Sequence, residues 1–314
     1  MRYLYTYQAQ HKVANLEEAI ETFGRNFGLW PRAGWPVADF PPEGWKMVFC
    51  PVGDLATAPT FFSLLQPTSF DEWIGRAWLE QAPRPYRYHC FAVVVDDLDF
   101  LIAHIRRLGI TYLISENLSW LKGRRLFIGR SPEDPLSYDP SFDAAVRFEV
   151  LPLAEHTFLD PPPPPSVPPG DLPPGAFIRV ESTSTLVDDI YEAIQLVGSN
   201  LLLWPAPGSY VQDDATEGVK RISVPIGVPQ STKLEIISPY DFNKPIGKWF
   251  KQYGKGQYHH RFSVTDLDTR LRELESRGVG FDVRGPDEVM NYRRAWIDPA
   301  YTLGANLEFV DYRT

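Results

Sequence analysis

The feature that most constrains the fold of this 314-residue chain is an internal repeat. The tripeptides Glu-Ala-Ile and Leu-Trp-Pro occur in that order at 18–31 and, with the same spacing, again at 192–205, which is 174 residues later. Asp-Leu-Asp followed by a glycine occurs in the same way at 97–109 and at 266–278. Two separate matches that both keep their spacing indicate that the second half is a diverged copy of the first.

A proline-rich segment separates the two copies. Residues 160–175 read DPPPPPSVPPGDLPPG, and nine of the 30 prolines of the chain lie within them. Proline has no amide hydrogen to donate and holds the backbone near polyproline II, so the segment predicts a semi-rigid spacer. We therefore predict an N-terminal domain at 1–157, a linker at 158–175 and a C-terminal domain at 176–314. A surface loop within a single domain is the alternative.

Charge and hydropathy exclude several classes of protein. The net charge is −9, and no cluster of lysine and arginine is long enough to follow a phosphate backbone, so nucleic acid is not an expected partner. No run approaches the roughly 18 apolar residues of a membrane-spanning helix, and the N-terminal MRYLYTYQAQHK lacks a signal-peptide core. Cys50 and Cys90 are the only cysteines, so no disulfide framework is expected. These features favour a cytoplasmic monomer or homodimer whose partner is a small molecule.

The hydrophobic pattern predicts the same order of elements four times. Amphipathic helices are expected from residues 16, 98, 190 and 267 onward, because apolar residues recur there at helical spacing. Each predicted helix follows a strand-like run, at 4–11, 88–95, 177–183 and 258–264. Each is followed by further strand-like runs, the last of which lie at 60–65, 146–151, 233–237 and 306–310. Two such units side by side predict an α+β fold with a curved sheet, helices outside and a concave interior.

Strand alternation predicts which polar side chains face that interior. In the run 258–264 the alternate apolar residues pack beneath the helix, so His259 and Arg261 face inward. The same reasoning turns Glu235 and Glu308 inward. One imidazole and two carboxylates in one cavity form a set suited to a divalent metal such as Mn, Fe(II), Co, Ni or Zn. The alternative is an ion-pair cluster in which Arg261 neutralises the two glutamates without a metal.

Several longer stretches resemble the vicinal oxygen chelate superfamily. In the second half these are GVKRISVPIG, TKLEIISP, HHRFSVTDLDTRLRELESRGVGF and DPAYTLGANLEFV, which are most similar to methylmalonyl-CoA epimerases and glyoxalase I. The first half is similar through NLEEAIETF, FFSLLQP, YHCFAVVVDDLD and VRFEVLPL. The resemblance implies tandem vicinal oxygen chelate domains, built from four βαβββ modules with curved mixed sheets and helices outside.

The resemblance also implies positions for metal ligands. In the second half these are Glu235, His259 and Glu308, and the fourth position, usually histidine in the family, is Ser182. Serine is a poor ligand for these metals, and three protein ligands leave open positions for substrate oxygens. In the first half, where Cys90 is in the ligand register and His89 is one residue out of it, the weaker second site comprises Gln8, Ser63, His89 or Cys90, and Glu149.

These positions imply a metal-dependent enzyme of the lyase or isomerase type that binds a small oxygenated molecule, stabilises an enolate and transfers a proton. Glu308 or Glu235 is the candidate base. Arg261, Tyr292 and Arg293 are the candidate substrate-binding residues, and Arg261 suits a substrate carboxylate. The family leaves two alternatives, a metal-free protein that sequesters antibiotics or other small molecules and an Fe(II) ring-cleaving dioxygenase. A single histidine in register counts against the dioxygenase.

Overall fold

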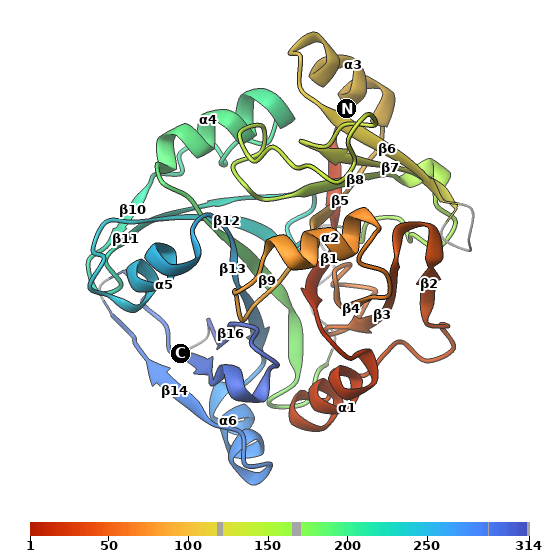
Figure 1. The fold of residues 1–314 in the computed structure, drawn as a ribbon. Coiled ribbons are helices and arrows are strands. Elements are labelled where there is room, and N and C mark those ends of the chain that lie inside the picture. The colour runs from red at the N-terminus through yellow and green to blue at the C-terminus, as the bar shows by residue number, and fades with distance from the viewer. Residues whose placement is uncertain (118–121, 165–170, 288, 313–314) are drawn as a thin grey trace. The chain divides into compact units, whose positions relative to one another are not determined.

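The computed structural model describes residues 1–117, 122–164, 171–287 and 289–312 (Figure 1). These residues form two eight-stranded sheets, one in each half of the sequence. The first sheet contains β1 (Tyr3–Lys12), β2 (Ala38–Phe40), β3 (Trp45–Pro51), β4 (Phe61–Pro67), β5 (Phe91–Val95), β6 (Tyr112–Asn117), β7 (Gly123–Ile128) and β8 (Phe148–Pro152). The second sheet contains β9 (Phe177–Leu186), β10 (Gln212–Asp214), β11 (Val219–Val224), β12 (Lys233–Pro239), β13 (Gly256–Val264), β14 (Phe281–Arg284), β15 (Arg294–Ile297) and β16 (Leu307–Val310).

The two sheets have the same strand order. It is β2-β3-β4-β1-β5-β8-β7-β6 in the first sheet and β10-β11-β12-β9-β13-β16-β15-β14 in the second. The first and last strands of a repeated unit pair in parallel, as β1 does with β4, β5 with β8 and β13 with β16. The prediction of four βαβββ modules in mixed sheets is therefore confirmed, and the modules are β1–β4, β5–β8, β9–β12 and β13–β16.

Each of the four predicted helices follows the first strand of its module. They are α1 (Leu16–Phe27), α3 (Leu98–Arg107), α4 (Ile190–Leu201) and α6 (Leu267–Ser276). Side chains of Asn15, Asp97, Asp189 and Asp266 accept hydrogen bonds from the first backbone amides of these helices and fix where each begins. Two further helices, α2 (Trp73–Glu80) and α5 (Pro245–Tyr253), join the two modules of each half. Short 3-10 turns lie at Pro41–Glu43, Leu153–Glu155 and Pro299–Tyr301. Among the described helices none combines the length and the apolar character needed to cross a membrane.

The chain divides into two compact units that do not coincide with its two halves. Unit 1 comprises Met1–Tyr7, Cys90–Pro162 and Ser184–Gln257, and unit 2 comprises Gln8–His89, Pro163–Thr183 and Tyr258–Thr314. Unit 1 therefore holds α3 and α4, while unit 2 holds α1 and α6. Each sheet nevertheless lies inside one predicted domain, and the domain boundaries at 157 and 176 stay a prediction.

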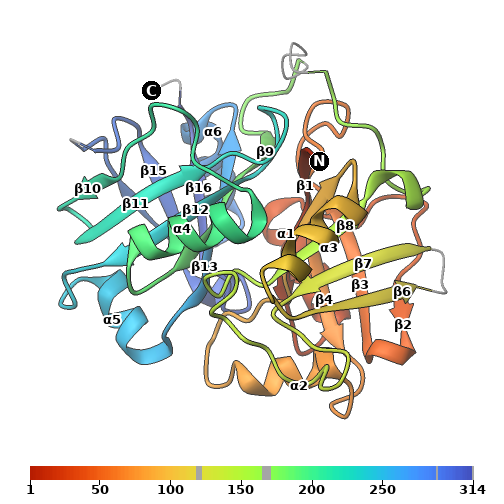
Figure 2. The same cartoon turned by 90° about the horizontal axis from the view of Figure 1, so that it is seen from above.

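The core of unit 1 joins one module from each half of the sequence. Helices α3 and α4 contact each other, and both can be followed in Figure 2. Their apolar faces, represented by Ile105 and Val197, belong to one buried cluster with Val93 of β5 and Ile236 of β12. The apolar helix faces that the residue spacing predicted thus also form the contact between the two copies.

The core of unit 2 is aromatic and also joins both halves. The ring of Phe262, which is fully buried, lies 5.5 Å from that of Phe62, 5.4 Å from Phe177 and 5.8 Å from Phe309. Phe27 of α1 completes the group with an edge-to-face contact to Phe309 at 5.8 Å. Such ring pairs add stabilisation beyond the area that they bury.

This core predicts that the two sequence halves unfold together. Phe262→Ala removes a ring that contacts residues of both halves, and we expect it to lower the free energy of unfolding by about 3–5 kcal/mol. Urea denaturation measures this loss, and hydrogen exchange should show lower protection in α1 as well as in β13. Phe100→Ala, at a side chain that is 50% exposed, is the control and should cost less than about 0.5 kcal/mol. Exchange that rises in β13 alone would contradict the shared core.

Candidate functional site

A buried arginine–glutamate pair recurs on the last two strands of three of the four modules. The nitrogen–oxygen distances are 3.3 Å for Arg125–Glu149, 3.4 Å for Arg221–Glu235 and 3.7 Å for Arg294–Glu308. In each pair the arginine lies two residues before the residue that stands opposite the glutamate, so both side chains share one face of the sheet. All six side chains are almost completely buried.

The remaining module lacks both members of the pair. Ser63 of β4 occupies the position of the glutamate and stands opposite Phe49. Met47, two residues before Phe49, occupies the position of the arginine. The hydroxyl of Ser63 donates to Oε1 of Gln8 at 2.8 Å, so this position carries a neutral hydrogen bond instead of an ion pair.

In the last module, which lies in unit 2, Glu308 is surrounded by three basic side chains. Its Oε2 accepts a short hydrogen bond from Nε of Arg261 and lies 3.6 Å from Nε2 of His259, while Oε1 lies 3.7 Å from Nη1 of Arg294. Burial by itself raises the pKa of Glu308, but the charge of Arg261 and the nearby imidazole of His259 outweigh burial and hold that pKa well below its usual range. Glu308 is therefore a carboxylate at neutral pH.

Several buried polar atoms of unit 2 have no hydrogen-bond partner in the described structure. Within the described ranges, Oε1 of Glu308, Nε1 of Trp296 and the hydroxyls of Ser182 and Ser263 are buried without a hydrogen-bond partner. The ring of Trp296 lies 5.1 Å from that of His259 and forms an apolar wall. Ser182, which the resemblance placed at the fourth ligand position, is buried as well.

Two of the predicted substrate-binding residues have other partners. Arg293 forms an ion pair of 2.9 Å with Asp268 of α6, and both side chains are partly exposed. The ring of Tyr292 packs on Tyr312 at 4.6 Å, and its hydroxyl donates to the sulfur of Met290 at 2.9 Å. Neither contact involves Arg261, and a role of these residues in substrate binding stays a prediction.

Glu235, the third ligand predicted for the second half, is held in an ion-pair chain of unit 1. Arg221 bridges Glu235 and Asp214, with its Nη2 only 2.6 Å from Oδ2 of Asp214. His259 and Glu308 belong to unit 2. The arrangement inside each unit resembles the metal-free ion-pair alternative considered for these glutamates.

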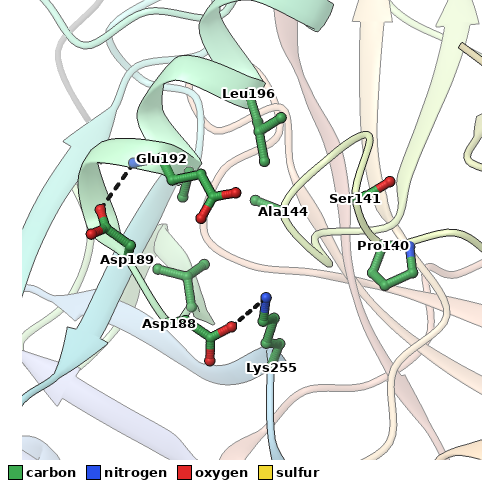
Figure 3. Close-up of a pocket in the computed structure, with 10 residues that line it drawn as sticks. Pro140, Ser141, Ala144, Asp188, Asp189, Glu192, Leu196 and Lys255 are labelled. Carbon is green, nitrogen blue, oxygen red and sulfur yellow. Dashed lines mark hydrogen bonds and ion pairs between the residues drawn. The ribbon is translucent and has the colours of Figure 1, made fainter.

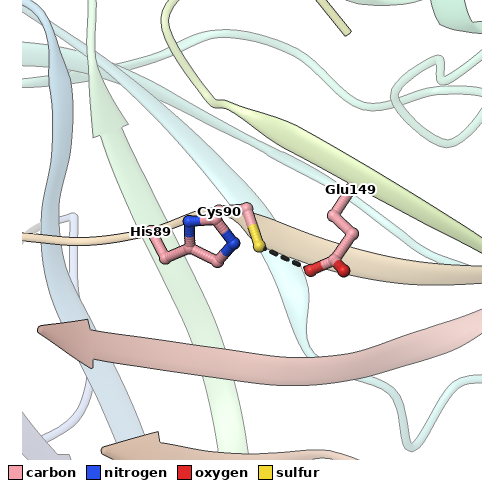
Figure 4. Close-up of side chains that lie close together, drawn as sticks. All are labelled: His89, Cys90 and Glu149. Carbon is pink, nitrogen blue, oxygen red and sulfur yellow. Dashed lines mark hydrogen bonds between the residues drawn. The ribbon is translucent and has the colours of Figure 1, made fainter. Parts of the chain in front are cut away.

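The structure brings together three metal-ligating side chains in the first half of the sequence. His89, Cys90 and Glu149 are buried, and their donor atoms all lie within 4.8 Å of one another (Figure 4). Across the ranges that the structure describes, this is the only group of three or more such residues that meets that distance. The thiol of Cys90 donates to Oε2 of Glu149 at 2.8 Å, and the ring of His89 packs on Trp73 at 5.3 Å.

The structure differs from the sequence-based prediction in where the regular strand begins relative to His89 and Cys90. The sequence predicts one strand at 88–95, with Cys90 in the ligand register and His89 one residue out of it. Strand β5 begins at Phe91, so both residues precede the regular alternation and both can approach Glu149. Counted along the paired strands, Cys90 occupies the position that His259 occupies in the second half.

A pocket in unit 1 is lined by acidic residues, but their carboxylates already form an ion pair or hydrogen bonds. It has a volume of about 150 Å³ and lies at the start of α4. Figure 3 shows Asp188 paired with Lys255 and Asp189 accepting from the backbone of Glu192. These carboxylates therefore cap a helix and form an ion pair.

No protein-family model matches the chain, and no curated protein matches it. Among solved structures, a mutant 4-hydroxymandelate synthase from Streptomyces coelicolor matches with a TM-score of 0.63 and 14% identity, covering 99% of this chain and 93% of that one. Because this match covers both halves of the chain, and therefore both sheets, it shows the fold. The chain has the tandem vicinal oxygen chelate fold.

Shorter structures match less than half of the chain. Methylmalonyl-CoA epimerase from Mycobacterium tuberculosis matches with 23% identity and a TM-score of 0.37, over 42% of this chain and 86% of that one. A Streptomyces coelicolor methylmalonyl-CoA epimerase in complex with 2-nitronate-propionyl-CoA matches with 18% identity and a TM-score of 0.39, over 44% of this chain and 100% of that one.

The lowered pKa of Glu308 predicts a pH-dependent contribution to stability. A carboxyl whose folded pKa lies below its unfolded value, about 4.3, stabilises the protein above that value and loses the effect as the pH falls toward the folded pKa. Glu308→Gln removes the anion that pairs with Arg261 and Arg294, of which Arg294 keeps Asp287, and should cost about 3–5 kcal/mol at pH 7.

Urea unfolding between pH 7 and pH 3 measures the difference between the wild type and Glu308→Gln. This difference should stay constant down to about pH 5 and shrink below about pH 4. Glu21→Gln, which removes an exposed ion pair with Arg25, is the control and should change little at any pH. A difference that stays the same at pH 3 would refute the ion-pair account of Glu308.

Proposed function

We propose that the chain is a divalent-metal-dependent enzyme of the lyase or isomerase type that acts on a small oxygenated molecule. The observation that supports this proposal is the group of His89, Cys90 and Glu149, whose donor atoms lie within 4.8 Å of one another on a vicinal oxygen chelate fold. We place the working site in the first half of the chain, whereas the sequence alone favoured the second.

The chemistry of the three donors fits a metal. One imidazole, one thiol and one carboxylate make a mixed nitrogen, sulfur and oxygen set, which suits Zn or Fe(II) better than Mg or Ca. Cys90 must release its proton to solvent to act as a ligand, and its hydrogen bond to Glu149 directs that proton toward an acceptor. A dication would also balance the two anions that result.

Arg125 gives Glu149 a fixed orientation. Its guanidinium pairs with Oε1, while Cys90 takes Oε2. When bound, the metal polarises substrate oxygens and stabilises an enolate. In this proposal Glu149, or a residue beside it that faces the substrate, accepts and returns the proton of the substrate carbon. Glu308 is less suited to that task because a carboxylate with a strongly lowered pKa is a weak base near pH 7.

The arginine partners of Glu235 and Glu308 favour a second candidate function, a metal-free protein that binds a small molecule. Each of these inward carboxylates is neutralised by guanidinium groups, so the second half needs no cation to hold its charges. Arg261, which binds Glu308, would then exchange that partner for a carboxylate of the ligand.

Elemental analysis of purified protein separates the two candidates. We expect about one equivalent of divalent metal per chain after metal supplementation, and at least a tenfold lower metal content in Cys90→Ser and Glu149→Gln. His259→Ala, at the position that corresponds to Cys90, is the matched control and should keep its metal. Loss of metal in His259→Ala alone would return the site to the second half, and metal-free wild type would favour the binding protein.

The reaction type needs a separate measurement on the metal-loaded protein. Exchange of deuterium from solvent into candidate 2-oxo or 2-methyl acids, without consumption of oxygen, is the expected result for enolate chemistry. Oxygen uptake with an aromatic diol would instead indicate ring cleavage and overturn the lyase or isomerase assignment.

A further inference from the structure

The first module buries the side-chain amide of a glutamine, Gln10 of β1. This residue is fully buried, and neither Oε1 nor Nε2 finds a hydrogen-bond partner among the residues that the structure places. Only its backbone carbonyl is engaged by a side chain, since it accepts from the hydroxyl of Tyr86 at 3.1 Å. A buried amide without hydrogen bonds costs free energy of folding, so its presence in the sheet needs a physical explanation.

The strand register shows how Gln10 differs from its counterpart in the last module. Gln10 stands opposite Ser63 in the parallel pair of β1 and β4. The equivalent position of the last module is Arg261, which stands opposite Glu308 and donates to it. Ser63 is shorter than a glutamate and donates to Oε1 of Gln8 at 2.8 Å. Ser63 therefore does not supply the partner that a glutamate would give to the amide of Gln10.

The fold does not require a polar side chain at this position. In the second module the residue that stands opposite the glutamate of the last strand is Ala92, which is fully buried. An apolar residue is thus compatible both with the strand pairing and with burial at this place. The amide of Gln10 is better explained by a ligand that it binds than by the packing of β1.

Aromatic side chains share the face of the sheet that carries Gln10. Phe49 stands opposite Ser63, so these two residues and Gln10 form one row across β3, β4 and β1. Phe61, two residues before Ser63 on β4, points to the same face. The rings of Phe49 and Phe61 lie 5.9 Å apart, and the ring of Trp35 lies 5.4 Å from each of them. In the row only the small Ser63 separates this aromatic wall from the amide.

Arg32 and Trp35 form the partly exposed margin of the aromatic wall. The guanidinium of Arg32 lies 4.3 Å over the ring of Trp35, and its backbone amide donates to the carbonyl oxygen of Phe49 at 2.8 Å. Both side chains keep some contact with solvent, whereas Phe49 and Phe61 are buried. Solvent therefore reaches the wall at the Arg32 and Trp35 end.

We propose that this face of unit 2 binds a planar ring compound that carries an N–H group next to a carbonyl group, as a lactam does. The amide of a glutamine offers one acceptor and one donor side by side, which complements that edge. Oε1 of Gln10 accepts from the ring N–H, Nε2 donates to the ring carbonyl, and the aromatic wall contacts the ring. Every residue of the site belongs to unit 2, and the site does not depend on a bound metal.

Calorimetric titration with 2-pyridone and with 1-methyl-2-pyridone tests this proposal. The methyl group of the second probe replaces the N–H group that Oε1 of Gln10 would accept. We expect saturable binding of 2-pyridone at one site per chain, and binding of the methylated probe that is weaker by about tenfold or more. Gln10→Leu should remove this difference, and Trp35→Leu should weaken the binding of both probes. Gln195→Leu, at an exposed position of α4, should change neither.

Thermal unfolding distinguishes a ligand-binding amide from a structural one. Gln10→Leu should leave the unfolding midpoint of the free protein unchanged or raise it, because it removes an amide that is buried without hydrogen bonds. Gln81→Leu is the matched control, since the buried amide of Gln81 donates to the carbonyl oxygens of Ala77 at 2.9 Å and Tyr88 at 2.8 Å. It should lower the midpoint and keep the preference for 2-pyridone.

The proposal is wrong if 2-pyridone shows no saturable binding, or if Gln10→Leu keeps the preference for it over the methylated probe. An unfolding midpoint that falls as far in Gln10→Leu as in Gln81→Leu would assign the amide to the fold instead. Binding should persist after treatment with a metal chelator. A probe that binds only the metal-loaded protein would contact the metal-ligating group, so failure of this proposal and failure of the metal assignment give different results.

Discussion

The interaction on which the interior of this fold depends is the buried arginine–glutamate pair across the last two strands of a module. A carboxylate inside a sheet of this kind costs several kcal/mol unless a cation neutralises it. In three modules an arginine two residues before the opposite position supplies that cation. Removing the only partner of a buried charge costs about 3–5 kcal/mol. This explains why the remaining module, with Ser63 and Met47, lacks both members together.

The same arginine–glutamate pairs limit how each half of the chain can bind a metal. A metal that binds Glu308 has to compete with Arg261 and Arg294, and the other predicted ligand positions of unit 2 are those of His259 and Ser182. In the first half one arginine pairs with Glu149, and Cys90 replaces the histidine at the corresponding position. A thiol that becomes an anion on metal binding restores the charge balance that a second carboxylate would have supplied.

The sequence predicted what local periodicity determines and missed what pairing across strands determines. Helices α1, α3, α4 and α6 followed from apolar residues at helical spacing, and the repeat predicted the two equivalent sheets. The arginine partners were detectable only in retrospect. Arg125, Arg221 and Arg294 each follow another basic residue and precede an apolar one, a pattern that Lys46 and Met47 keep only in part. The sequence placed His89 and Glu149 in the weaker second site but left open whether His89 or Cys90 faces the glutamate. Both approach it, because β5 starts three residues later than alternation suggested.

Duplication also explains why the starts of α1 and α4 share a capping side chain but differ in the residues around it. The helix start, its cap and the preceding strand end are required by the fold, so both copies keep Asn15 or Asp189 at the cap. The residues around the cap differ between the two copies. Lys12 corresponds to Leu186 in the other copy, which buries an apolar side chain where the first copy buries an ammonium. A leucine there is the simpler solution for stability, so the first copy carries a cost that the contacts of Lys12, such as its hydrogen bond to the carbonyl oxygen of Ile74, have to offset.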